Sequence, residues 1–178
     1  MAKIRKIEPV NLFIGIIYGK QVCLAEIEKI LTNKFGEIEL KSSDMNFDFT
    51  EYYLEEMGQG LFKRLYSFKT LIDPLYLADV KLFTNDIEQK YEVNGKRIFN
   101  LDPGYLDLPK VVLASAKDFS HRLYIGKSIF AEITLSFVKN HYTFLPWTYS
   151  DYKTEEYLNF FYEMRSLYKN KLESKNDN

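Results

Sequence analysis

Charged and polar residues of several chemical types gather between Asn100 and Asp151, within segments that otherwise resemble core strands. Burying such groups without partners costs free energy, so half-buried strands usually exclude them or pair them. The residues of this cluster are Asn100, Asp102, Lys117, Asp118, His121, Arg122, Glu132 and Asp151. A cluster of both signs beside core strands is either a paired structural network or a binding or catalytic site.

An anion-binding group is predicted where an expected core strand, residues 110–116, ends and the next strand begins. Lys117, His121 and Arg122 lie in this connection, and strand ends can present side chains together. His121 could act as a general acid or base near neutral pH, with Glu132 as a second catalytic group. Alternatively, His121 packs at the edge of the core and has no chemical role.

Arg122 and Glu132 are expected to face each other across a hairpin. Strands at 121–125 and 129–138 would meet around Gly126-Lys127-Ser128. A slip of one residue would set apolar side chains against polar ones, so the pattern itself selects this register. The pair is either a cross-strand ion pair worth roughly 0.2–1 kcal/mol or an anion clamp in which Glu132 orients the planar guanidinium.

Asn100 and Asp102 are two residues apart and would share one face of a short strand. Their oxygens could ligate Mg²⁺ or Ca²⁺, together with Glu132 or Asp151, and Asp102 is the metal candidate. Alternatively, Asp102 accepts backbone hydrogen bonds within a turn formed by Asp102-Pro103-Gly104, because this tripeptide is typical of turns.

An aromatic loop around Trp147 and Asp151 follows the hairpin. Trp147 could form a stacking wall or a lid over a ligand, with Asp151 as a ligand-binding carboxylate. Alternatively, the loop closes the core before the last helix, and Asp151 caps that helix. A second polar group, Lys81, Asn85 and Glu88, forms one stripe on an expected helix, and a solvated helix face explains it.

Composition narrows the functional classes. The 178 residues are enough for one domain with a core. The 24 basic and 25 acidic residues give a net charge of −1, which disfavours a general nucleic-acid binder. One cysteine and two histidines cannot form an intrachain disulfide or a zinc cluster of Cys and His ligands. Cys23 falls in an apolar helical pattern, where we expect it to be buried.

The compartment is predicted from the apolar segments. The longest apolar run, Val10–Tyr18, is much shorter than the roughly 20 residues of a membrane-spanning helix. The basic start of the chain is not followed by a small-residue cleavage site after a sufficient apolar region. We therefore expect a cytoplasmic protein that does not enter a membrane.

The predicted fold is α+β, because helices interrupt the strands without strictly alternating with them. We expect a single domain over residues 1–172, with a largely antiparallel sheet, a ferredoxin-like βαββα first half, extra C-terminal strands and a C-terminal helix. A polar tail, 173–178, is expected to be disordered. The other elements are expected at 10–18 (strand), 21–35 (helix), 37–41 and 61–72 (strands), 74–91 (helix), 97–101 (strand) and 154–172 (helix).

Several motifs occur in order along most of the chain, while the phosphate loop, GxGxxG, HExxH and GxSxG patterns do not occur. The motifs are Asp48-Phe49-Thr50-x-Tyr52-Tyr53 with Glu56-Met57-Gly58, Lys81-x-x-Thr84-Asn85, Asn100-x-Asp102-Pro103-Gly104-Tyr105, Lys117-Asp118-x-x-His121-Arg122, Ala131-Glu132-x-Thr134 and Pro146-Trp147-Thr148-Tyr149-x-Asp151-Tyr152. They resemble the pattern of a bacterial family known as a domain of unknown function (DUF4416). The resemblance carries no activity, cofactor or catalytic residue.

The leading hypothesis is a protein with a binding site for a small anion or nucleotide. In its enzymatic form, the protein would cleave phosphate esters with the help of Mg²⁺. Lys117, His121 and Arg122 would bind the anion, and Asp102 and Glu132 would orient them or hold the metal. These side chains should then line one cleft.

The alternative is a non-enzymatic binding or scaffolding module, including a version that binds RNA. Here the charges form a static network, and aromatic side chains contact a partner. The aromatic content of 16% fits either a tyrosine-rich core or a stacking surface. Neither the ligand nor the oligomeric state follows from the sequence.

Overall fold

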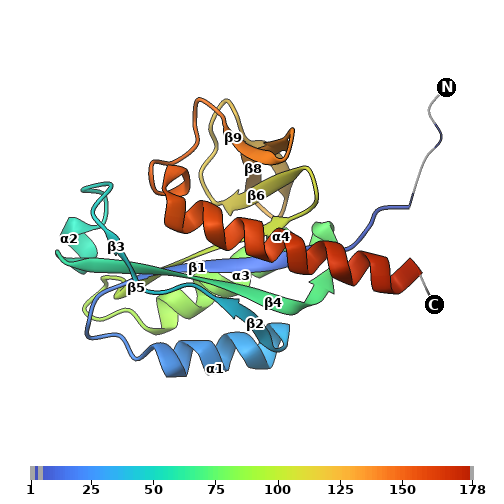
Figure 1. Ribbon diagram of the computed structural model, residues 1–178. Helices are drawn as coiled ribbons and strands as arrows, with labels where there is room; N and C mark the ends of the chain where they lie inside the picture. Colours follow the sequence, from blue (N-terminus) through green and yellow to red (C-terminus); the bar gives the residue numbers. More distant parts are fainter. Residues whose placement is uncertain (1–2, 4–5, 177–178) are drawn as a thin grey trace.

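The protein is a single α+β domain in the computed structural model, which describes residues 3 and 6–176 (Figure 1). Within these residues, nine strands form one sheet, and every strand pair in it is antiparallel. The predicted α+β class, the largely antiparallel sheet and the C-terminal helix are confirmed. None of the described helices is long and apolar enough to cross a membrane.

The sheet has the main order β2-β4-β1-β5-β6-β8-β7, with β3 on β4 and β9 on β8. The elements are β1 (Val10–Tyr18), α1 (Leu24–Phe35), β2 (Ile38–Lys41), β3 (Met45–Phe47), α2 (Leu54–Met57), β4 (Leu61–Ile72), η1 (Pro74–Tyr76), α3 (Leu77–Lys90), β5 (Phe99–Leu106), β6 (Lys110–Ser115), β7 (Leu123–Gly126), β8 (Ile129–Val138), β9 (His141–Phe144), η2 (Asp151–Lys153) and α4 (Glu155–Asn176).

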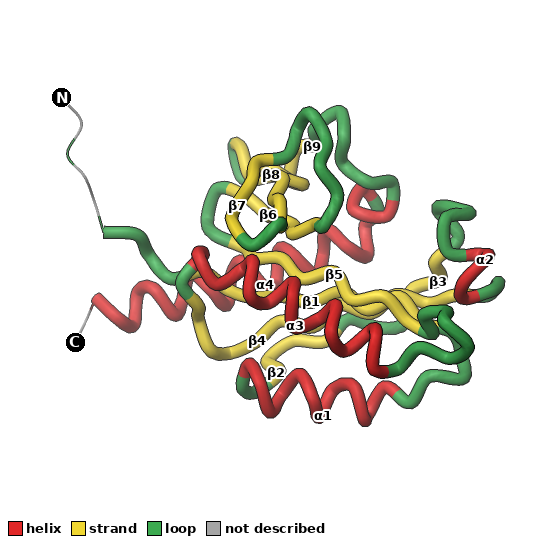
Figure 2. Tube along the Cα trace, turned by 180° about the vertical axis from the view of Figure 1, so that it is seen from behind, coloured by secondary structure: helices red, strands yellow, loops and turns green. Residues whose placement is uncertain are grey.

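Helices cover both faces of the central strand β1, and this explains its almost entirely apolar sequence. The side chains of Ile14 and Ile16 pack against α1 and α3 on one face, while Phe13 packs against α4 on the other. Figure 1 shows α4 crossing one face of the sheet, and Figure 2 shows α1 and α3 on the opposite side. Beside α4, the strands β6, β8 and β9 rise out of the plane of β1 and β4 (Figure 1).

The predicted turn at Asp102-Pro103-Gly104 is wrong, because β5 passes through it and pairs with β1 there. Pro103 has no N–H to donate, but β6 pairs with β5 only from Gly104 onward, so no described strand needs that bond. Gly104 is required for close packing. A Cβ atom there would lie 2.4 Å from the carbonyl oxygen of Val112 and 2.5 Å from the ring of Phe13.

The predicted hairpin register is confirmed. Leu123 pairs with Ala131, and the ion pair between Arg122 and Glu132 forms at the next position. The short strands β3 and β9, of three and four residues, were not predicted. Strands of this length show too little alternation to be recognised without their partners.

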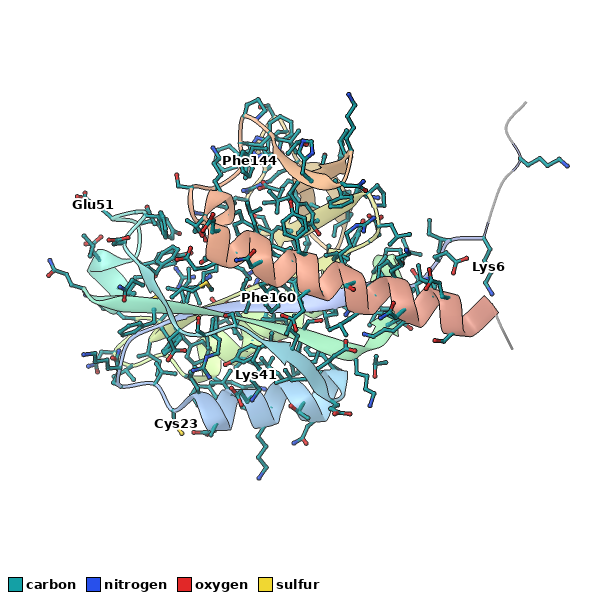
Figure 3. The ribbon with its side chains drawn as sticks, in the orientation of Figure 1. Lys6, Cys23, Lys41, Glu51, Phe144 and Phe160 are labelled. Atoms are coloured by element: carbon teal, nitrogen blue, oxygen red, sulfur yellow. The ribbon has the colours of Figure 1, made fainter. Side chains whose placement is uncertain are left out.

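Two predicted details of the helices are wrong. The first helix begins at Leu24, and Cys23 is exposed at its N-terminus (Figure 3). The C-terminal helix reaches Asn176. Residues 173–176 are therefore helical, and their predicted place in a disordered tail is wrong. Leu172 packs against the core, and Lys169 pairs with Glu173 at 3.6 Å, so the last turns gain packing and charge pairing. Residues 177–178 lie outside the described residues.

Candidate functional site

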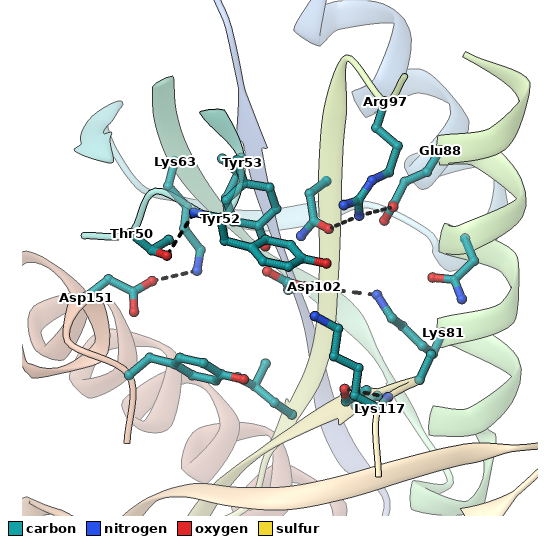
Figure 4. Close-up of a pocket in the computed structure, with 18 of the residues that line it drawn as sticks. Thr50, Tyr52, Tyr53, Lys63, Lys81, Glu88, Arg97, Asp102, Lys117 and Asp151 are labelled. Carbon is teal, nitrogen blue, oxygen red and sulfur yellow. Dashed lines mark hydrogen bonds and ion pairs between the residues drawn. The ribbon is translucent and has the colours of Figure 1, made fainter. Parts of the chain in front are cut away.

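A pocket of about 590 Å³ lies where β1, β4 and β5 meet α3, the segment before α2 and the connection that follows β6 (Figure 4). Its volume falls in the range of roughly 300–1,000 Å³ that small-molecule sites occupy. Its charged and amide lining comes from Lys63, Lys81, Asn85, Glu88, Gln89, Glu92, Arg97, Asn100, Asp102, Lys117, Arg122, Glu132 and Asp151. Aromatic side chains line it too, namely Phe47, Tyr52, Tyr53, Phe119, Tyr149 and Tyr152.

The floor of the pocket follows from the register of three strands. Lys63, Ile17 and Asn100 form one row across β4, β1 and β5, and the next row places Gly15 beside Asp102. Residues two apart on a strand point to the same face, so these polar side chains share one face of the sheet. The predicted common face of Asn100 and Asp102 therefore lies on the pocket.

Lys63 is one of the paired cations of the pocket. Its Nζ donates to Asp151 Oδ2 at 2.7 Å, and the two side chains are only 3% and 5% exposed. The same ammonium lies 4.9 Å from the ring centroid of Tyr152 and 5.3 Å from that of Tyr157. Gly15 leaves room for the lysine stem, because a Cβ atom there would lie 3.1 Å from Lys63 Cε. This buried pair closes one end of the pocket.

Arg97 is also paired. Its guanidinium donates to Glu56 and to Glu88 Oε2, and its Nη1 donates to Asn100 Oδ1 at 2.8 Å. The other oxygen of Glu88 accepts the backbone N–H of Leu101 at 2.8 Å. Burial raises the pKa of Glu88 above its ordinary value, although nearby positive charge and the N–H of Leu101 act against this rise. Arg97 thus ties α2, α3 and β5 together.

Arg122 forms the most saturated network of the site. Its Nε donates to Glu132 Oε2 at 2.6 Å. Its Nη1 donates to Ser115 Oγ at 2.8 Å and to the carbonyl oxygen of Lys117 at 2.9 Å, and its Nη2 donates to the hydroxyl of Tyr149 at 2.8 Å. A guanidinium has five N–H donors, so few of them remain for an anion.

His121 lies on the outer side of this network and does not line the pocket. Its Nε2 lies 3.0 Å from Glu132 Oε2. Its ring is stacked between those of Phe119 and Trp147, at centroid distances of 6.0 Å and 4.9 Å. Trp147 is also outside the pocket lining, and its Nε1 donates to the carbonyl oxygen of Ile133. Both aromatic rings therefore hold the imidazole against Glu132.

Lys81 and Lys117 differ from the other cations. Lys81 Nζ donates to the carbonyl oxygen of Leu101 at 2.8 Å, and its nearest carboxylate oxygen, on Asp102, is 4.0 Å away. Lys117 Nζ lies 4.0 Å from the ring centroid of Tyr52 and has no carboxylate within 4.0 Å among the described residues. Figure 4 shows both ammonium groups pointing toward the middle of the pocket, beside Asp102.

Tyr52 and Lys117 also influence each other chemically. Hydrogen bonding from the ammonium of Lys117, together with its positive charge, lowers the pKa of the Tyr52 hydroxyl below its ordinary value, because both stabilise the phenolate. Tyr52 belongs to the segment before α2, and Lys117 follows β6, so their contact joins two connections at the pocket. A ligand anion would meet Lys117 beside this hydroxyl.

The pocket brings together six of the residues predicted from sequence. These are Asn100, Asp102, Lys117, Arg122, Glu132 and Asp151, whereas His121, Trp147 and Asp118 are outside its lining. In the described residues, no group of three or more His, Cys, Asp or Glu side chains is placed to hold a metal ion. Each of the three proposed carboxylate ligands lies beside a different cation instead: Asp102 lies beside Lys81, Glu132 binds Arg122, and Asp151 binds Lys63.

Sequence reasoning missed the pocket residues that α3 and β4 supply. Lys81 and Glu88 were assigned to a solvated helix face, which is wrong, because both are buried and line the pocket. Lys63 carried a usable signal. It shares the strand parity of Leu61 and Leu65, so it is a charged residue between two apolar neighbours on the same face.

Comparison with known proteins identifies the family. The family model described as Domain of unknown function (DUF4416) matches residues 8–168, which is most of the chain. No curated protein and no solved structure matches this chain. The motifs that suggested this family from the sequence lie within the matched residues. The chain belongs to the DUF4416 family.

Proposed function

We propose that this protein binds a small anionic ligand of about nucleotide size, with the phosphate or carboxylate group between Lys81 and Lys117. The observation that carries the proposal is the difference in pairing among the pocket cations. Lys63, Arg97 and Arg122 each bind a carboxylate closely, but Lys81 and Lys117 have none nearer than 4.0 Å among the described residues.

Electrostatics favours an anion at this position. Charges interact more strongly in a partly buried site than in water, and two ammonium groups without a close counter-ion attract an anion. Aromatic rings and the amides of Asn85 and Gln89 line the same pocket. They could stack on a planar group and hydrogen-bond its edge.

The roles predicted from sequence change within this proposal. Lys117 keeps its place as an anion ligand, and Lys81 joins it. Arg122 becomes a positioning residue, because its N–H groups already bind Glu132, Ser115 and Tyr149. His121 supports Glu132 from outside the pocket.

Calorimetric titration of adenosine 5′-monophosphate and inorganic phosphate tests the proposal. Replacing Lys81→Met or Lys117→Met should weaken binding of either probe by about tenfold or more, since each variant removes a charge-assisted hydrogen bond. The control is Lys127→Met, whose ammonium pairs with Asp79 on the surface outside the pocket. At 100 times the dissociation constant, a bound probe should also stabilise the fold by about 2.7 kcal/mol. Absence of binding, or equal loss in the Lys127→Met control, would contradict the proposal.

A phosphate-ester enzyme is the second candidate, and the position of Asp102 favours it. Its carboxylate lies on the pocket floor beside the proposed anion site, within 4.0 Å of Lys81 Nζ, where it could act as a general base. Hydrolysis of p-nitrophenyl phosphate, with and without Mg²⁺, tests this candidate. Asp102→Asn should lower the rate by about 10²–10⁴-fold, and a rate that does not change would remove the enzymatic version.

We also infer that residues 10–106 form a ferredoxin-like unit, which the remaining strands extend. The order β2-β4-β1-β5 supports this, as does the packing of α1 and α3 on the same face of β1. In this arrangement, the strand residues that line the pocket lie on the opposite face, while α3 lines it from beside β5, at the junction between the unit and its extension through β6 and β8.

A further inference from the structure

The segment between β3 and β4, residues 48–60, leaves the sheet and returns to it at a single point. Phe47 pairs directly with Leu61, so the two ends of the segment are neighbours. Compact surface loops whose ends lie together in this way are frequently functional. Figure 1 shows this segment, which contains α2, at one end of the sheet. We call residues 48–60 the strap, and three of its side chains line the pocket, namely Thr50, Tyr52 and Tyr53.

Few contacts attach the strap to the rest of the protein. Its backbone hydrogen bonds are internal, such as the one from Met57 N–H to the carbonyl oxygen of Tyr53, and none joins its backbone to that of another element among the described residues. Met57 is the buried residue of the strap and packs against Ile17 and Leu61. A segment with so few contacts to the core can open while the rest of the fold stays closed.

An ion pair between Glu56 and Arg97 fastens the strap. Glu56 Oε2 accepts from Arg97 Nε at 2.9 Å, and the two side chains are 38% and 21% exposed. A partly exposed ion pair stabilises only modestly, so it can break and re-form. Arg97 Nη1 separately donates to Glu88 Oε2 at 3.2 Å and to Asn100 Oδ1 at 2.8 Å. These two bonds do not involve the strap, so its opening leaves the guanidinium paired.

Two glycines supply a hinge at the C-terminal end of the strap. Gly58 and Gly60 have positive φ angles of 79° and 70°, which glycine adopts more readily than other residues. A Cβ atom at either position would meet nothing within 4 Å, so side-chain packing does not hold this turn in place. The hinges of lids are short stretches of this kind, which take up changes in φ and ψ.

We propose that the strap opens and closes over the pocket, that the ion pair between Glu56 and Arg97 is its latch, and that a bound anion holds it closed. The last part rests on the proposed function. Figure 4 shows Tyr52 extending over the pocket toward Lys117, whose Nζ lies 4.0 Å from the ring centroid. An anion on Lys117 would meet the hydroxyl of Tyr52, which can donate a hydrogen bond to it. The anion therefore binds the closed state more tightly and shifts the population toward it.

Labelling of a thiol at the buried position of the strap tests the proposal. Met57→Cys places this thiol in a Cys23→Ser background, which removes the exposed natural cysteine. N-ethylmaleimide is an uncharged reagent, and mass spectrometry follows its rate of reaction. Met45→Cys in the same background is the control, since Met45 is similarly buried but lies on β3, outside the strap. The thiol in the strap should react about threefold or more faster than the control thiol.

Two neighbouring glutamates give a matched test of the latch. Glu56→Ala removes the latch, whereas Glu55→Ala makes the same change of charge and keeps the backbone oxygen that binds Lys96. In the Met57→Cys reporter, Glu56→Ala should speed labelling about threefold or more relative to Glu55→Ala. Saturating adenosine 5′-monophosphate should slow labelling of the reporter about threefold or more. Neither change should alter the Met45→Cys control.

Hydrogen exchange repeats the comparison without a substitution at a buried position. Backbone amides of the strap are followed in the unmodified protein, in Glu56→Ala and in Glu55→Ala, with and without adenosine 5′-monophosphate. Exchange in the strap should rise in Glu56→Ala and fall with the nucleotide, while β1 and α3 stay unchanged. This measurement decides the matter if Met57→Cys does not fold.

The outcomes separate this inference from the proposed function. Equal labelling of the two thiols would mean that the strap opens only when the sheet does, and would overturn the proposal. Equal effects of Glu56→Ala and Glu55→Ala would overturn the latch. If adenosine 5′-monophosphate binds in calorimetry but leaves the strap unchanged, the anion site remains and its closure by the strap is wrong. If the nucleotide does not bind, the proposed function and closure by an anion are both wrong, and the comparison of the two glutamates still decides whether the strap opens.

Discussion

The two sides of the pocket use cationic residues in opposite ways. On the paired side, defined here by Arg122, Glu132 and His121, nearly every polar group of the arginine binds another residue. On the open side, defined by Lys81, Asp102 and Lys117, the charged groups are 4.0 Å or more from a counter-ion among the described residues. Arg122 and Glu132 of the paired side line the same cavity as the three residues of the open side.

The difference shows that partners decide the role of a charged side chain more than its residue type does. A guanidinium is well suited to bind phosphate, yet here its fork is occupied by a carboxylate, a serine, a carbonyl group and a tyrosine. A lysine ammonium with one carbonyl partner keeps donors for a ligand. The paired side should therefore matter mainly for stability, and the open side mainly for binding.

Breaking the ion pair between Arg122 and Glu132 on the paired side should have the largest effect on the free energy of unfolding. Arg122→Met leaves the carboxylate of Glu132 buried with only His121 nearby, and removing one partner of a buried ion pair typically costs about 3–5 kcal/mol. Lys81→Met removes one hydrogen bond to a carbonyl group and should cost about 1 kcal/mol. Urea denaturation followed by circular dichroism measures both free energies of unfolding.

A surface arginine provides the control for this comparison. Arg64 pairs with Asp44 and Glu28 and is partly exposed, so Arg64→Met should cost no more than about 1 kcal/mol. If Lys81→Met destabilises the protein as much as Arg122→Met does, the distinction between the two sides is wrong. If Arg122→Met is neutral for stability but abolishes anion binding, Arg122 is a ligand-binding residue.

Strands β5 and β1, which lie under the pocket, should also differ in how well they tolerate an added methyl group. Gly104→Ala places a methyl group against the backbone oxygen of Val112, which cannot move easily, and should cost about 1–3 kcal/mol. Gly15→Ala meets flexible side-chain ends of Lys63 and Leu65 at 3.1 Å and should cost less. Thermal unfolding of both variants measures the difference, and an equal loss would contradict it.

Much of the fold could be predicted because the long strands and the hairpin carry strong local patterns. β1 is an almost continuous apolar run, β4 spans the predicted range, and alternation selected the register of Arg122 against Glu132. The break at Asp102-Pro103-Gly104 was wrong because local turn chemistry competes there with pairing to β1, which is distant in sequence. Only the three-dimensional structure shows that β1 provides the partner.

The candidate site could be predicted only in part, and its missing residues have a common cause. The charges between Asn100 and Asp151 were recognisable because they interrupt strands. The stripe of Lys81 and Glu88 looked like any exposed helix face, since periodicity does not show what a polar face meets. Its burial depends on how α3 lies beside β5, which no local pattern in the sequence reports.

The smallest expected effect concerns the pH dependence of anion binding at the open side. Tyr52 is 54% exposed, and Lys117 lowers the pKa of its hydroxyl, so its phenolate forms at lower pH than that of a free tyrosine. The phenolate carries negative charge beside Lys117 and would compete with a ligand anion there. Anion affinity should therefore fall as the pH rises through the lowered pKa of Tyr52.

Calorimetric titration of adenosine 5′-monophosphate between about pH 7 and pH 10 measures this loss, because the phosphate stays almost fully ionised over that range. The loss should amount to less than about 1 kcal/mol, the scale of an interaction between exposed charges. Tyr52→Phe should flatten the profile, since it keeps the ring over Lys117 and removes the ionisable hydroxyl. By linkage, the bound anion should raise the pKa of Tyr52, which phenolate absorbance can follow. An identical profile in Tyr52→Phe would mean that the anion does not bind beside Lys117, and the open side would lose its proposed role.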